Sequence, residues 1–185
     1  MGVSTVENVV PVGEWALDSL HSSVGFGVRH LGLNEFSGSF EDYGVELVVD
    51  ASGEIALSGY VDVESIAVEQ PDLRGHLLSP EFFDLERHAR ITYVADSVEV
   101  DGGDVVINGV LTIKGQSRPV EVRGVVNGPV TGLDGKRHLA LELSAVIDRT
   151  QYGLDWQAVS ADGTQVLANE VTLTAAIQLV DQATS

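Results

Sequence analysis

The sequence contains no cysteine and few basic residues, and both shortages exclude classes of function. Without cysteine, the chain has no disulfide, no thiolate metal ligand and no cysteine nucleophile. Its 10 Lys and Arg residues are scattered among 28 Asp and Glu residues, which gives a formal net charge of −18. Such a surface repels nucleic-acid phosphates and anionic lipid headgroups. We therefore expect neither a nucleic-acid partner nor stable membrane insertion.

Long hydrophobic runs are also missing. No segment approaches the ~20 apolar residues of a membrane-spanning helix. The opening stretch MGVSTVENVVPVGEW has neither the basic start nor the apolar run of a secretory signal, which predicts a cytoplasmic protein. A length of 185 residues suits a single domain. We expect a flexible lead-in over residues 1–13, one domain over 14–180 and a short tail over 181–185.

Apolar and polar residues alternate along most of the chain. The clearest examples are residues 139–147 and 171–179, where every second residue is apolar. This period of two is typical of antiparallel strands with one buried face. Clusters such as DGGD and LDGK separate these stretches and suit tight turns. The spacing predicts an all-β barrel or sandwich of about eight or nine strands.

Residues 70–84 break the alternation. Pro71 and the pair Ser79-Pro80 resemble helix starts, with Ser79 in the position of an N-cap. We therefore predict two short helical turns here, which together cross one end of the sheet.

The stretch HSSVGFGVRH, residues 21–30, has two unlike faces. One face carries two glycines, which allow close approach of another backbone or strong coiling of the strand. The other face presents an apolar row that ends in a histidine: Val24, Phe26, Val28 and His30. Because an eight-stranded barrel is wide enough to hold one small ligand, we expect this row to face an internal cavity.

The motifs of common catalytic sites are missing. The five histidines have no metal-binding spacing, and the sequence contains neither a G-x-S-x-G elbow nor a glycine-rich phosphate loop. The sequence therefore predicts no metal, no cofactor and no enzymatic activity.

Four groups of residues form an ordered pattern. The first contains Trp15, Asp18, His21, Ser22, Phe26, His30, Gly38 and Phe40, and the second is LRGHLLSPEFFD. The third is GVLTIKG with Pro119 and Val120, and the fourth contains Arg149, Tyr152, Gly153 and Leu154, followed by NEVTLTAAIQL. In this order they resemble the motifs of the YceI-like family, the polyisoprenoid-binding, lipocalin-like proteins of bacteria. The chain departs from that family in HARITY, residues 88–93, where relatives usually show a tyrosine-proline pair.

The resemblance implies an elongated, eight-stranded antiparallel lipocalin-like barrel with a short helical segment near 71–84. It also implies an internal pore that holds a long isoprenoid or a similar lipid tail. Some relatives resemble carriers or stores of isoprenoid quinones or their precursors. Relatives often form homodimers, and we expect the same here.

The leading prediction is non-enzymatic binding, storage or transport of a long apolar lipid, such as a polyisoprenoid or an isoprenoid quinone or its precursor. One alternative is an enzyme acting on such a lipid, with His21 or His30 as acid–base and Asp18 or Asp84 as orienting group. Another is a filled barrel with a structural or stress role and no ligand. The predicted ligand-binding residues are Val24, Phe26, Val28, His30, Leu47, Leu57, Arg74, His76, Phe82, Phe83, Leu141, Leu143, Arg149, Leu173 and Ile177.

Overall fold

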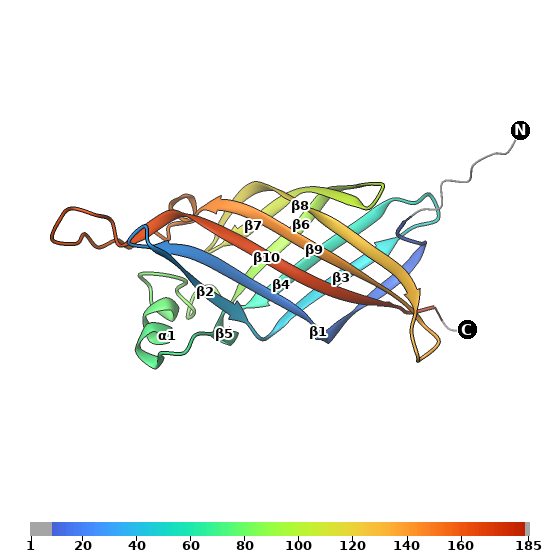
Figure 1. Ribbon diagram of the computed structural model, residues 1–185, viewed down its shortest axis with the longest axis horizontal. Coiled ribbons are helices and arrows are strands. Elements are labelled where there is room, and N and C mark those ends of the chain that lie inside the picture. The colour runs from blue at the N-terminus through green and yellow to red at the C-terminus, as the bar shows by residue number, and fades with distance from the viewer. Residues whose placement is uncertain (1–8, 184–185) are drawn as a thin grey trace, which may run out of the picture.

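Antiparallel strands dominate the computed structural model, which describes residues 9–183 (Figure 1). The strands are β1 (Gly13–His30), β2 (Asn34–Phe40), β3 (Tyr43–Val49), β4 (Ile55–Asp62), β5 (Ile66–Ala67), β6 (Arg90–Asp101), β7 (Asp104–Ile113), β8 (Gln116–Thr131), β9 (Arg137–Asp148) and β10 (Leu167–Asp181). The helical elements of this part of the chain are α1 (Pro71–Leu78) and two 3-10 turns, η1 (Val63–Ser65) and η2 (Arg149–Tyr152).

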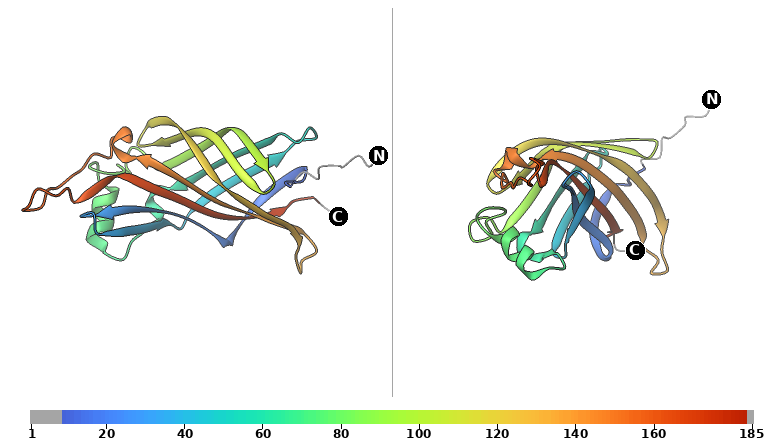
Figure 2. Two further views of the ribbon diagram at one scale, coloured as in Figure 1. Left: turned by 45° about the horizontal axis from the view of Figure 1, so that its top comes forward. Right: turned by 60° about the vertical axis from the view of Figure 1, so that its left-hand side comes forward.

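The strands form a closed barrel with eight strand positions around its circumference. Paired strands are antiparallel and follow the order β10-β9-β8-β7-β6-β4-β3-β1-β2-β5, and β1 also pairs with β10 to close the sheet. β2 and β3 pair with successive parts of β1, and β5 and β4 pair with β2 and β3 in turn. Two of the eight positions are therefore each occupied by two shorter strands. The predicted eight-stranded antiparallel barrel with one short helical segment is confirmed. The barrel is elongated, and α1 lies at one end of it (Figure 2).

The long first strand contains the close backbone contact that its glycines suggested. A register shift between Asp18 and Ser23 divides β1 into one half that pairs with β3 and one that pairs with β2. A Cβ atom at Gly25 would lie 2.8 Å from the carbonyl oxygen of Gly38 on β2. The glycine therefore permits an approach that any side chain would prevent.

Apolar side chains fill the half of the barrel that lies away from α1. The largest buried cluster includes Trp15, Leu47, Val105, Leu139 and Leu179. Burial of such side chains is the main source of stability of the fold, at about 1.5–3 kcal/mol for each large aliphatic residue. This end of the barrel is therefore closed by packed core.

The ordered barrel extends slightly beyond the expected domain limits. Val10 belongs to the core cluster, with 4% of its surface exposed, and β10 continues to Asp181. Residues 1–8 of the expected lead-in and 184–185 of the expected tail lie outside the described residues.

The connection between β5 and β6 contains only one of the two predicted helical turns. Pro71 occupies the first turn of α1, where its missing N–H breaks no hydrogen bond. Ser79 ends α1, because its hydroxyl donates to the carbonyl oxygen of His76 at 2.7 Å instead of capping a following helix. Residues 80–83 form turns, so the predicted second helix start was wrong. Within residues 9–183, no helix has the length and apolar character needed to cross a membrane.

Candidate functional site

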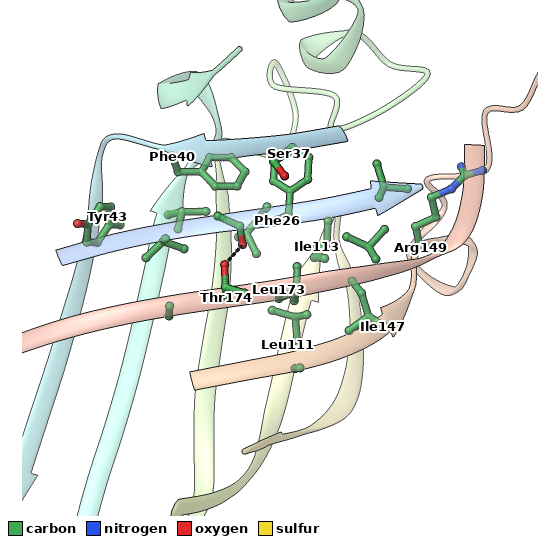
Figure 3. Close-up of a pocket in the computed structure, with 18 of the residues that line it drawn as sticks. Phe26, Ser37, Phe40, Tyr43, Leu111, Ile113, Ile147, Arg149, Leu173 and Thr174 are labelled. Carbon is green, nitrogen blue, oxygen red and sulfur yellow. Dashed lines mark hydrogen bonds between the residues drawn. The ribbon is translucent and has the colours of Figure 1, made fainter. Parts of the chain in front are cut away.

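The half of the barrel beside α1 contains a cavity of about 1300 Å³. Its floor is formed by Leu57, Ile107, Leu141 and Ile177, which also belong to the packed core at the closed end. Higher on the wall, Phe26, Leu111, Ile113 and Leu173 point into the same space (Figure 3). The cavity is therefore a closed-bottomed apolar chamber rather than a channel through the barrel.

Aromatic rings line one side of the chamber. The ring centroid of Phe26 lies 5.9 Å from that of Phe40 and 6.4 Å from that of Phe36. Phe83, from the turns after α1, meets Phe40 edge-on at 6.2 Å. The ring of Phe26 also covers Gly38, where an added Cβ would lie 2.5 Å from its Cζ atom. Because Gly38 has no side chain, the ring can lie along the wall and leave the centre of the cavity open.

A histidine packed between two aromatic rings marks the upper end of the chamber. The His76 ring meets Phe82 at 4.9 Å and Trp156 at 5.2 Å between centroids, both edge-on. Its Nε2 atom lies 2.6 Å from Oε2 of Glu81. The imidazole of His76 therefore already has a carboxylate partner outside the cavity.

Arg149 lines the cavity, but its guanidinium serves the neighbouring loop. The residue is 3% exposed, and its guanidinium points away from the aliphatic lining (Figure 3). Nε donates to the carbonyl of Ala168 at 2.8 Å, and Nη1 donates to the carbonyls of Leu154 and Trp156. Nη2 makes a longer contact of 3.4 Å with the carbonyl of Leu167. Arg149 thus ties the two ends of the 154–168 segment together, while burial lowers its pKa from the ordinary value.

Two cavity tyrosines stay protonated near neutral pH. Burial, with a smaller contribution from Asp96, raises the pKa of Tyr93 to about 12, and its hydroxyl donates to the carbonyl of Val120 at 2.9 Å. Burial also raises the pKa of Tyr43. The phenols therefore add hydrogen-bonding groups to the chamber without adding charge.

One edge of the barrel beside the cavity has incomplete strand pairing. β2 pairs with β5 only through Ser39 and Phe40. Residues 34–37 of β2 and residues 67–70 before α1 all line the cavity. The rim of the cavity therefore lies between the open edge of β2 and the start of α1.

Comparison of the sequence with known proteins places the chain in a family. A sequence model described as the YceI-like domain matches residues 15–179. The chain belongs to the YceI-like family. A UPF0312 protein of Staphylococcus epidermidis is 28% identical over 167 residues, which cover 87% of this chain and 94% of the relative. A UPF0312 protein of Shewanella sp. (strain W3-18-1) is 31% identical over 127 residues, covering 64% of this chain and 66% of the relative.

Solved structures share the fold at low sequence identity. BcnA of Burkholderia cenocepacia superposes with a TM-score of 0.73 at 18% identity, covering 88% of this chain and 98% of that one. The YCEI protein of Campylobacter jejuni gives a TM-score of 0.71 at 23% identity, with coverages of 90% and 97%. A polyisoprenoid binding domain from Saccharophagus degradans, implicated in plant cell wall breakdown, gives 0.66 at 15% identity, with coverages of 90% and 98%.

Most residues predicted to bind a ligand meet in the chamber of this YceI-like barrel. Thirteen of the fifteen line it: Val24, Phe26, Val28, His30, Leu57, His76, Phe82, Phe83, Leu141, Leu143, Arg149, Leu173 and Ile177. His30 lies on the rim with an exposed side chain. Leu47 packs in the filled core below the floor, and Arg74 makes an exposed hydrogen bond to the carbonyl of Glu64, so neither lines the cavity.

Several lining residues of this YceI-like protein were missed from the sequence. Leu111 and Ile147 lie on strands in which apolar and polar residues alternate, so the sequence could predict that they face inward. It could not predict their position along the barrel axis. Tyr43 and Tyr93 also follow strand alternation. Trp156 lies in an irregular loop, where no sequence period indicates which way a side chain points.

The groups considered for acid–base catalysis do not gather at the cavity. His21 Nδ1 lies 2.8 Å from Asp18 Oδ2 on the outside of β1, and this hydrogen bond lowers the pKa of Asp18. Asp84 is 6% exposed but does not line the cavity, and His30 lies at the rim. Across residues 9–183, no group of three or more His, Asp or Glu side chains could hold a metal ion.

Proposed function

We propose that this YceI-like protein binds a long apolar lipid, such as a polyisoprenoid, with the tail in the barrel cavity and without chemical conversion of the lipid. The main support for this proposal is the chamber of about 1300 Å³, which has a packed floor and an almost wholly aliphatic and aromatic wall. Empty apolar cavities of this size are not expected in a stable core, since interiors are close-packed.

The size of the chamber suits an extended or folded lipid tail. At roughly 30 Å³ per non-hydrogen atom, the share of a water molecule in the liquid, the volume corresponds to about 40 atoms. Each methylene group transferred from water contributes about 0.8 kcal/mol. Burial of the tail alone therefore supplies enough free energy to offset the cost of ordering it.

The comparison with the Saccharophagus degradans domain supports this ligand class, because a protein of the same fold is described as polyisoprenoid binding. Within that class, an isoprenoid quinone or its precursor has a suitable apolar tail. The protein would then act as a carrier or a store, releasing the lipid unchanged.

The chamber argues against a filled structural barrel, because a filled barrel leaves no such volume. The rival enzyme would need acid–base groups beside the bound lipid. The paired His21 and Asp18 lie outside the barrel, and only His30 of the proposed groups reaches the rim.

The test is native mass spectrometry of the purified protein, followed by solvent extraction and identification of bound molecules. We expect a discrete added mass that extracts as an isoprenoid or another long-chain lipid. A matched pair of variants on β9 locates it. Ala145→Phe adds a ring to the cavity lining, whereas Val146→Phe adds the same ring at an exposed neighbour.

Loss of the added mass in Ala145→Phe, with retention in Val146→Phe, is the expected pattern. The proposal fails if the parent protein carries no added mass and also fails to bind polyprenols in titration. It also fails if Ala145→Phe, still folded by circular dichroism, retains the lipid as well as the parent does.

A further inference from the structure

We propose that residues 68–75, which include the first turn of α1, form a movable lid over a side entrance to the chamber. The lipid enters and leaves between β2 and this lid instead of through the end of the barrel. The proposal rests on the proposed function, because it concerns the route by which the bound lipid reaches the cavity.

The wall of the barrel is interrupted along the outer edge of β2. β2 pairs with β5 only through Ser39 and Phe40. Farther along, residues 34–37 and residues 68–70 both line the cavity, yet in the described part of the chain no backbone hydrogen bond joins these two segments. β7 and β8, by contrast, are joined by a continuous ladder. An opening at the edge of β2 therefore breaks no strand ladder.

The sequence explains why the ladder stops at this point. Extension of the register of the Ser39–Ala67 pair would place Ser37 opposite Glu69 and the next outward position of β2 opposite Pro71. Pro71 has no N–H to donate to a strand, and its fixed φ suits the first turn of a helix. The chain therefore leaves the sheet at Pro71, and α1 takes the place of a paired strand at this end of the barrel (Figure 1).

The two ends of α1 are attached unequally. At the C-terminal end Leu77 is buried, and its carbonyl accepts a hydrogen bond from the N–H of Phe83 at 3.0 Å. At the N-terminal end the side chain of Gln70 makes no capping hydrogen bond, and Pro71 and Asp72 are exposed. The first turn of α1 can therefore move while the last turn stays anchored.

The face of the lid toward the chamber is apolar. Val68 and Leu73 are half-buried, line the cavity and belong to the cluster around Phe40. On the outer side, Arg74 donates an exposed hydrogen bond to the carbonyl of Glu64. Opening of the lid exposes two aliphatic side chains and breaks this exposed bond, which makes it a small local rearrangement.

The end of the barrel is held more firmly than its side. The N–H of Leu31, in the turn between β1 and β2, donates to the carbonyl of Val166 at 2.8 Å. Arg149 ties together the two ends of the 154–168 segment. The rings of Trp156 and Phe82 lie 5.7 Å apart at the upper end of the chamber. Entry through the end must disturb these contacts, whereas entry from the side leaves them in place.

The experiment locks the lid by cross-linking, which the absence of native cysteine makes specific. Ser37→Cys with Glu69→Cys places one thiol on each side of the gap, and a short bis-maleimide that contains a cleavable disulfide joins them. Thr112→Cys with Ser117→Cys is the matched control. Those two hydroxyls already lie 2.7 Å apart on paired strands, and neither residue lines the cavity.

The readout is the rate of binding and of release of a fluorescent polyene alcohol, followed by stopped-flow fluorescence. Each double variant is measured before cross-linking, after cross-linking and after reduction. We expect the 37–69 lock to slow both rates at least about tenfold, with recovery on reduction, because exchange must wait for the lid to open. The Kd should change by less than about twofold, since the lock raises the barrier to exchange in both directions. The control lock should leave both rates unchanged.

Unchanged rates in the locked 37–69 variant overturn the side entrance, and so does equal slowing by the two locks. Failure of the reagent to join the two thiols overturns the lid, because the segment then does not lie across the gap. A changed Kd with unchanged rates assigns residues 68–75 to the wall alone and also overturns the lid. If the parent protein binds neither the polyene alcohol nor a polyprenol, the proposed function itself fails.

Discussion

Replacement of Arg149 by methionine tests whether a buried cation organises the cavity mouth. Methionine keeps the aliphatic lining but removes every donor to the carbonyls of Leu154, Trp156, Leu167 and Ala168. Three of these contacts are 2.8 Å or shorter. A buried carbonyl that loses its partner costs about 1–3 kcal/mol, and water can reach some of this loop. We therefore expect the free energy of unfolding to fall by about 3–5 kcal/mol.

The measurement is urea unfolding followed by tryptophan fluorescence, with lipid titration of the folded variant. Lipid affinity should fall as well, because the carbonyl of Trp156 is one of the groups that Arg149 holds, and Trp156 lines the cavity. Arg123→Met is the matched control, since Arg123 makes only an exposed ion pair with Glu121. Such pairs contribute at most about 1 kcal/mol. If Arg149→Met unfolds within about 1 kcal/mol of the parent protein, the structural role assigned to its guanidinium is wrong.

Further predictions concern backbone clearance and pH. Gly124→Ala should lower the free energy of unfolding by about 1–3 kcal/mol or more, because the new Cβ would lie 1.8 Å from the carbonyl oxygen of Glu142. Gly75→Ala in α1, where nothing lies within 4 Å of the new Cβ, should raise the free energy of unfolding by about 0.5–1 kcal/mol. Equal effects of the two variants in urea unfolding would contradict this reasoning. Asp181 is buried, and burial by itself raises the pKa of its carboxyl group. The hydrogen bond from the Ala183 N–H and the ion pair with Arg137 together outweigh this effect, so the pKa lies below the usual value. Asp181→Asn should therefore destabilise the protein at pH 7, and its difference from the parent should narrow as the pH falls below about 4. A difference that stays the same at pH 7 and pH 3 would contradict this coupling.

Strand alternation predicted an all-β barrel or sandwich because it reports a local property. Each residue on a strand faces the opposite side from its neighbours, so the apolar row from Leu139 to Ile147 predicted an inward face before any partner was known. The same rule placed Phe26 and Leu173 on the wall. The absence of cysteine, the acidic composition and the missing catalytic motifs are likewise properties that need no fold to read.

Height along the barrel axis depended on the tertiary structure. Leu47 and Leu57 follow the same alternation and are direct partners across β3 and β4. Leu57 reaches the cavity floor while Leu47 belongs to the filled core, because strand stagger and barrel tilt set how far each position lies from the mouth. A period of two carries no information about that distance.

The surroundings of the irregular segments also depended on the fold. The sequence suggested Arg149 as a mouth residue, but its partners are carbonyls up to 19 positions away, brought near only when the 154–168 segment closes on itself. Trp156 reached the cavity through the same closure. By itself, the sequence determined which side chains face inward, since that follows from local backbone geometry. Only the tertiary structure decided which of them enclose empty volume, since that follows from how the strands are staggered and where the loops close.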